Sequence, residues 1–138
     1  MKRLSEGIYP SLSWAFIIMV LMGMPGNVFP AVVDFWEWLG TDKLVHLFLF
    51  SVLSFLFLWG YRNKLLTSQE SYKRKMFFLS LLIGLLYAAL TELLQYYLFI
   101  NRYGSFFDFI ADAIGCILGL FVFVIYLKKK IKKNKIRE

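Results

Sequence analysis

The chain has 138 residues, of which 59% are hydrophobic and 18% are charged, and its formal net charge is +7. The charged residues are confined to short segments between long apolar runs, a pattern typical of an integral membrane protein and not of a soluble domain. The basic residues flank these runs, so we interpret them as membrane-orientation signals; no basic nucleic-acid-binding module is present. The length predicts one domain covering 1–138, and the single cysteine, Cys116, excludes an intrachain disulfide.

Four apolar runs are long enough to cross a bilayer, which requires about 20 mostly apolar residues. They cover residues 11–29, 43–61, 76–100 and 106–127. We therefore predict an all-α integral membrane protein built as a four-transmembrane-helix bundle. Lys2 and Arg3 precede the first run, as in a signal peptide, but no small-residue cleavage site follows, so we expect this run to persist as a helix.

Basic and aromatic residues predict how the spans are oriented. Of the 16 Lys and Arg residues, all but Lys43 and Arg102 lie in the N-terminal segment, in the connection between the second and third spans, or in the tail at 128–138. Because Lys and Arg concentrate on the cytoplasmic side, both termini are predicted to be cytoplasmic. The tail is interpreted as an orientation signal, with attraction to anionic lipid as a second interpretation. Residues 31–42 are rich in aromatic side chains and predict a short interfacial helix.

Ionisable residues gather toward the opposite, outer ends of the spans. Glu92 and Asp112 lie about two helical turns inside their spans, and His46 lies one turn inside. An ionisable group at such a position costs at least about 2.5–3.5 kcal/mol on insertion scales, so it normally faces protein or a wet cavity. Spacings of four residues place Asp42 with His46, and Asp108 with Asp112, on single helix faces. We predict an outward-facing ligand-binding site formed by Asp42, Lys43, His46, Glu92, Gln95, Arg102, Asp108 and Asp112.

Small residues recur beside these polar positions with a spacing that permits close helix approach. The predicted packing positions are Gly84, Ala88, Ala111, Gly115 and Gly119. A structural alternative for the polar cluster stays open. Arg102 could pair with Asp108 or Glu92, and His46 could bond Glu92 or Gln95, so that the network would simply hold the helices in register. The number of titratable groups favours a binding or reactive site instead, in which Glu92 and His46 are the candidate catalytic residues.

Taken together, the polar positions resemble the VanZ-like family of bacterial membrane proteins. The segment from Asp42 to His46 is similar to that family's DKxxH element, and the residues from Glu92 to Gly119 are similar to its E-x-x-Q…R-x-x-S-x-x-D…G-x-x-x-G pattern. Asp112 departs from the family, which more often has Asn there, and this alters the charge balance of the site. The resemblance covers 42–119 and implies a plasma-membrane protein associated with resistance to teicoplanin, a lipoglycopeptide that acts at the outer membrane surface.

Three functions remain open from the sequence. The first is a non-enzymatic envelope protein whose outer pocket binds a lipid headgroup, a cell-wall precursor or a lipoglycopeptide. The second is a membrane enzyme on a lipid-linked substrate, with Glu92 and His46 as acid and base and with Asp108 and Asp112 holding a cation. The third is a small lipid or proton-coupled transporter.

The sequence contains no GxSxG element, phosphate-cradling loop or HExxH motif, so we expect no resident metal or cofactor. The expected partners are the lipid bilayer and, for the first function, a cell-wall precursor or lipoglycopeptide, with no nucleic acid. Oligomerisation is left open.

Overall fold

The computed structural model describes residues 6–24, 41–98 and 105–136, and within these residues it contains helices and no strand. In chain order the helices are α1 (Tyr9–Gly23), α3 (Thr41–Gly60), α4 (Arg62–Thr67), α5 (Glu70–Tyr97) and α6 (Phe106–Lys135). Of these, α3, α5 and α6 are long and apolar enough to cross a membrane, and α1 is a shorter apolar helix. These helices confirm the predicted class, an all-α membrane protein, whereas the number of spans and their orientation stay predictions.

The longest helices extend beyond the apolar runs that predicted them. α5 begins at Glu70 instead of residue 76, and α6 continues to Lys135, because the Lys, Arg and Glu residues at these ends are good helix formers. α6 has 30 residues. At 1.5 Å per residue it is about 45 Å long, against a hydrocarbon core of about 30 Å. The predicted basic tail is therefore largely a continuation of α6.

The connections differ more from the prediction. The short helix α4 lies in the connection between the second and third predicted spans, where no helix was predicted. α1 ends at Gly23, and residues 25–29 of the predicted first span lie outside the described residues. The predicted interfacial helix at 31–42 also falls mostly outside them.

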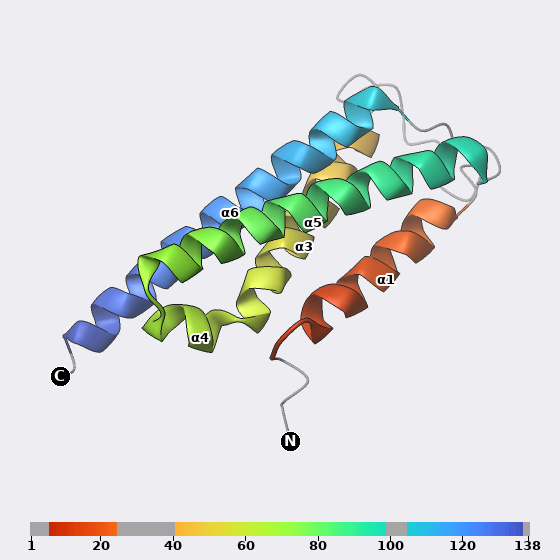
Figure 1. Cartoon of the computed structure of the whole chain (residues 1–138). Helices are drawn as coiled ribbons and strands as arrows, with labels where there is room; N and C mark the ends of the chain where they lie inside the picture. Colours follow the sequence, from red (N-terminus) through yellow and green to blue (C-terminus); the bar gives the residue numbers. More distant parts are fainter. Residues whose placement is uncertain (1–5, 25–40, 99–104, 137–138) are drawn as a thin grey trace.

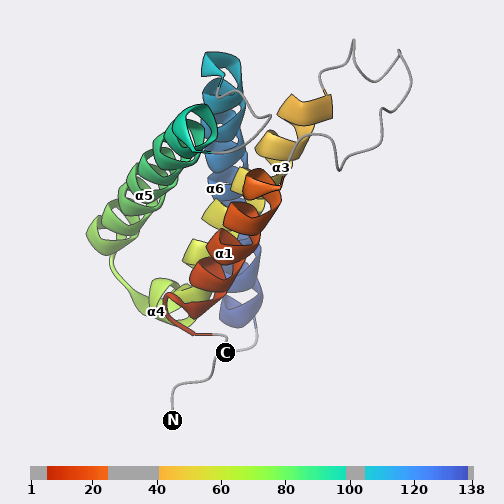
Figure 2. The ribbon, with the colours of Figure 1, turned by 90° about the vertical axis from the view of Figure 1, so that its right-hand side faces the viewer.

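The four long helices alternate in direction, so that their ends form two distinct groups. In Figures 1 and 2, the last turns of α1 and α5 and the first turns of α3 and α6 lie at one end of the molecule. The first turn of α1, the short helix α4 and the last turn of α6 lie at the other end. We call the first group the polar end, because it carries the ionisable residues predicted from the sequence.

α3 and α6 run in the same direction and form the most extensive helix contact of the bundle. Their backbones approach at two glycines of α6. A Cβ atom built on Gly115 would collide with the carbonyl oxygen of Leu47, and one built on Gly119 would collide with that of Ser51. Only glycine permits this separation, which explains the spacing of small residues predicted from the sequence.

The other small positions are also buried. Gly84 of α5 lies against the sulfur of Cys116, and Ala88 is fully buried. Ala111 of α6 is 7% exposed. The small residues on both helices therefore face the interior.

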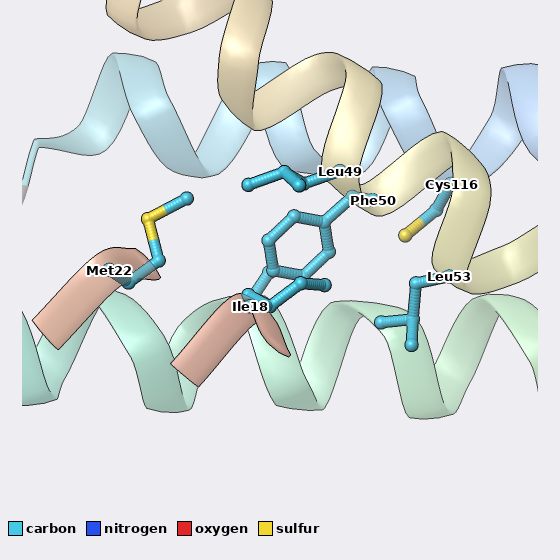
Figure 3. Packing of buried hydrophobic residues seen from close by; sticks show 7 residues of the cluster. Ile18, Met22, Leu49, Phe50, Leu53 and Cys116 are labelled. Carbon is cyan, nitrogen blue, oxygen red and sulfur yellow. The ribbon is translucent and has the colours of Figure 1, made fainter. Parts of the chain in front are cut away.

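α1 packs on the groove between α3 and α5. Figure 3 shows Ile18 of α1 against the ring of Phe50 of α3, within a cluster that also contains Met22, Leu49, Leu53, Ala88 and Cys116. Two hydrogen bonds fix α1 further: the Trp14 indole donates to the carbonyl of Leu49 at 2.9 Å, and the Tyr87 hydroxyl donates to that of Ala15 at 2.6 Å. Each bond gives a partly buried side-chain donor an acceptor, which matters where no water is available.

The outward faces of the helices are strongly apolar. Phe16, Phe78, Leu86 and Phe121 are each more than 60% exposed in the isolated chain. Exposed apolar surface on this scale is unfavourable in water and normal against lipid tails. The distribution of side chains therefore agrees with helices whose outer faces contact a bilayer.

Gly119→Ala should destabilise the bundle, because the added methyl group must push α3 and α6 apart. Overpacking of this kind costs about 1–3 kcal/mol, measurable as a lower free energy of unfolding in detergent titrations of the purified protein. Val122→Ile adds one carbon on the exposed face of the same helix and should change stability by less than about 0.5 kcal/mol. Equal effects of the two substitutions would contradict the close contact.

Candidate functional site

The centre of the polar end is a contact between His46 of α3 and Asp112 of α6. The Nδ1 atom of His46 lies 3.0 Å from Oδ1 of Asp112. The two side chains are 1% and 0% exposed. The contact follows from the glycine packing, because Gly115 lies one turn after Asp112 and rests on the backbone of Leu47, next to His46. A hydrogen bond to a carboxylate at Nδ1 fixes the orientation of the imidazole ring.

Glu92 of α5 bridges this pair to the beginning of α6. Its Oε1 atom lies 3.6 Å from Nδ1 of His46, and its Oε2 atom accepts a 2.8 Å hydrogen bond from the backbone N–H of Ser105. Ser105 is the N-cap of α6, and its hydroxyl accepts from the N–H of Phe107. Glu92 therefore contacts both α3 and the N-terminus of α6, where the partial positive charge of the helix favours an anion.

Lys43 and Asp108 form a second pair one turn closer to the end of the bundle. The Lys43 ammonium lies 3.2 Å from Oδ1 of Asp108. The lysine side chain is 48% exposed, whereas Asp108 is nearly buried in the first turn of α6. Along the parallel helices α3 and α6, Lys43 thus faces Asp108, and about one turn later His46 faces Asp112.

The remaining predicted site residues are not placed with this cluster. Gln95 is buried, but its amide donates to α1, 3.5 Å from the carbonyl oxygen and 3.3 Å from the sulfur of Met22. The backbone of Asp42 belongs to α3, but its side chain and all of Arg102 lie outside the described residues. Of the predicted residues, the structure thus brings together His46, Glu92 and Asp112, with Lys43 and Asp108 beside them.

The structure also changes the predicted use of the two aspartates of α6. The sequence places Asp108 and Asp112 on one helix face and allows them to share a cation. In the structure Asp108 pairs with Lys43, whereas Asp112 pairs with His46. The carboxylate that shares a partner with Asp112 is therefore not Asp108 but Glu92 of α5, which contacts the same imidazole nitrogen.

Two contributors to the site were not assigned a role from the sequence. The backbone N–H of Ser105 binds Glu92, and a main-chain donor carries no residue-type signal that a sequence pattern could reveal. Met22 receives the Gln95 amide, and nothing in the sequence relates α1 to the end of α5. Ser105 directly precedes the apolar run of α6, and the preference for serine at N-caps is the part of this signal that a sequence can reveal.

The arrangement has the elements needed for proton transfer or for binding a positively charged group. The His46 imidazole can donate or accept a proton, and two carboxylates contact its Nδ1 atom. The cluster is enclosed by three helices, so its electrostatic interactions are less screened than those of surface charges. The pair of Lys43 with Asp108 lies at the more exposed margin.

The two ion pairs should differ in strength, and a double-mutant cycle can measure each. With His46→Gln and Asp112→Asn, we expect a coupling energy of about 1–3 kcal/mol, because both groups are buried. With Lys43→Gln and Asp108→Asn, solvent around the lysine should reduce the coupling to about 0–1 kcal/mol. Free energies of unfolding in detergent titrations give both values. A stronger coupling in the Lys43 pair would contradict the assigned burial.

Comparison with known proteins identifies the family. The family described as VanZ/LLP1 matches residues 8–127, which include α1, α3, α4 and α5 and most of α6. No curated protein and no solved structure matches the chain. Since the match covers most of the chain, including every residue of the buried cluster, the protein belongs to the VanZ-like family, as the sequence pattern predicted.

Proposed function

We propose that this VanZ-like protein crosses the bacterial plasma membrane four times, with both termini in the cytoplasm and the polar end near the outer surface. The end of the bundle that carries α4 and the lysines of α6 holds most of the basic residues, and such residues are retained on the cytoplasmic side. α1 has 15 residues, but the apolar sequence continues through Phe29, which gives the first span its length.

We infer that the protein acts in glycopeptide resistance by binding an envelope molecule at the polar end. Family membership links the chain to such resistance, and the observation that carries the binding proposal is the buried contact of His46 with Glu92 and Asp112. Three ionisable side chains within membrane-spanning helices are costly for the fold, and such groups are normally kept for function. The ligand class is a lipid headgroup, a cell-wall precursor or a lipoglycopeptide.

The same contacts give each charged group a role in this proposal. Lys43 is half exposed at the margin of the site, so its ammonium can turn from Asp108 toward a phosphate or carboxylate of the ligand. Glu92 and Asp112, deeper in the bundle, would accept hydrogen bonds from sugar or amine groups that enter from the polar end. Arg102 and the Asp42 side chain are proposed to contribute to the same binding site.

A second candidate function is catalysis on a lipid-linked envelope substrate. The observation that favours it is the 3.0 Å distance between His46 Nδ1 and Asp112 Oδ1, which orients the imidazole as an acid or base. Glu92, 3.6 Å from the same nitrogen, is placed to share a proton with it. In this case the substrate bond would be broken at the polar end, and the lipid tail would remain in the membrane.

The topology can be tested with single cysteines in a Cys116→Ala background. Tyr97→Cys at the exposed end of α5 should react with a membrane-impermeant maleimide in intact cells. Lys133→Cys, near the end of α6, should react only after the cells are permeabilised. Labelling of Lys133→Cys in intact cells, or of Tyr97→Cys only after permeabilisation, would contradict the proposed orientation.

Teicoplanin susceptibility tests the role of the buried cluster. A bacterial host that expresses the wild-type protein should tolerate more teicoplanin than the host alone. Glu92→Gln, which keeps the shape and removes the charge, should lose most of this protection at matched membrane levels. Glu70→Gln is the matched control, because Glu70 lies exposed at the opposite end of the same helix, and it should protect like the wild type.

The outcomes separate the candidates. Equal protection by both variants would assign Glu92 a structural role and contradict the proposed site. If Glu92→Gln loses protection but the purified variant still binds the envelope lipid that the wild type binds, catalysis is favoured over binding. If binding and protection are lost together, the binding function is supported.

A further inference from the structure

We propose that His46, Glu92 and Asp112 form a binding site for a divalent transition-metal ion of the zinc type. These three residues offer one imidazole nitrogen and two carboxylate oxygens, and the donor atoms all lie within 4.8 Å of one another. They come from α3, α5 and α6, so a single ion would connect three helices. The site replaces the expectation from the sequence that no metal is bound, and it does not depend on the resistance function proposed above.

The two distances from the imidazole nitrogen to the carboxylate oxygens are close to those around a small metal ion. Zn²⁺ binds imidazole nitrogen and carboxylate oxygen at about 2.0–2.2 Å, so neighbouring ligand atoms of a tetrahedral site are about 3.3–3.6 Å apart. Nδ1 of His46 lies 3.0 Å from Oδ1 of Asp112 and 3.6 Å from Oε1 of Glu92. Small side-chain rotations would therefore suffice to place an ion among the three atoms.

Hydrogen bonding alone does not account for the position of Glu92. Its Oε2 atom is used by the N–H of Ser105, but its Oε1 atom is buried and has no hydrogen-bond partner among the described residues. An N–H at Nδ1 of the imidazole can point at only one of the two carboxylates, and Asp112 is the nearer one. Such a hydrogen bond would leave Oε1 of Glu92 without a donor. A metal ion at the position of that proton would bind Oε1 and Oδ1 together, which gives the unused oxygen of Glu92 a partner.

The charge of the cluster also favours a bound cation. Two carboxylates contact one imidazole, and their combined charge matches that of a divalent cation. Within the part of the chain that the structure describes, the lysine at this end, Lys43, pairs with Asp108 instead. A divalent cation among these donor atoms would neutralise both carboxylates of Glu92 and Asp112.

The donor set also selects the type of ion. Imidazole nitrogen is a good ligand for Zn²⁺ and related transition metals, whereas Ca²⁺ and Mg²⁺ prefer sites made of oxygen atoms. With three protein ligands, a four-coordinate ion would keep one position for water or for a ligand entering from the polar end. Zn²⁺ should therefore bind more tightly than Ca²⁺.

The test uses the full-length chain without an affinity tag, because His46 is then the only histidine. Metal-stripped protein in phosphatidylcholine nanodiscs should bind one Zn²⁺ per chain in calorimetric titrations, and equal concentrations of Ca²⁺ should not displace it. Glu92→Gln, Asp112→Asn and His46→Gln should each weaken binding at least tenfold. Asp108→Asn, a matched carboxylate one turn away on α6, should bind like the wild type.

Two further measurements keep the test decisive if a variant is poorly folded. Zn²⁺ should raise the thermal unfolding temperature of the wild type and of Asp108→Asn, because a ligand that binds the folded state stabilises it. In the wild type, ¹⁵N NMR of the single histidine should show a Zn²⁺-dependent shift of Nδ1. Absence of stoichiometric binding by the folded wild type, or a histidine signal unchanged by saturating Zn²⁺, would overturn the proposal, as would undiminished binding by the three variants.

Discussion

The close contact of α3 and α6 determines where every polar group of the site lies. Gly115 and Gly119 allow the backbone of α6 to rest directly on the carbonyl oxygens of α3. Because the two helices are parallel and in contact at intervals of one turn, Asp108 is placed opposite Lys43 and Asp112 opposite His46. A side chain at either glycine would move the helices apart and change the separation of these pairs together.

α5 completes the site by crossing back toward the same end of the bundle. Its carboxylate at Glu92 reaches both His46 and the backbone N–H of Ser105, so it connects α3 to the N-terminus of α6. The Gln95 amide, one turn further on, binds α1 through Met22. Polar contacts at this end therefore join all four long helices, whereas the apolar cluster around Phe50 and Ile18 packs the middle of the bundle.

Burial of ionisable groups is the feature that separates this bundle from an ordinary set of apolar spans. Small residues bring α3, α5 and α6 into close contact, and the histidine with two carboxylates lies beside this apolar packing. These groups carry a cost in a membrane that binding or chemistry at the polar end would explain. Membership of the VanZ-like family suggests a membrane protein linked to glycopeptide resistance.

The sequence by itself determined the helical membrane class, the approximate positions of α3, α5 and α6, and the family, because apolar length and fixed residue spacings are local properties of a chain. It also identified His46, Glu92 and Asp112 as unusual, because ionisable residues inside apolar runs are visible without a structure. Only the tertiary structure decided that Asp108 pairs with Lys43, that Glu92 binds the N-cap of α6, and that Gln95 turns toward α1. These partners depend on helix direction, rotation and register, which are set by packing between segments far apart in the sequence.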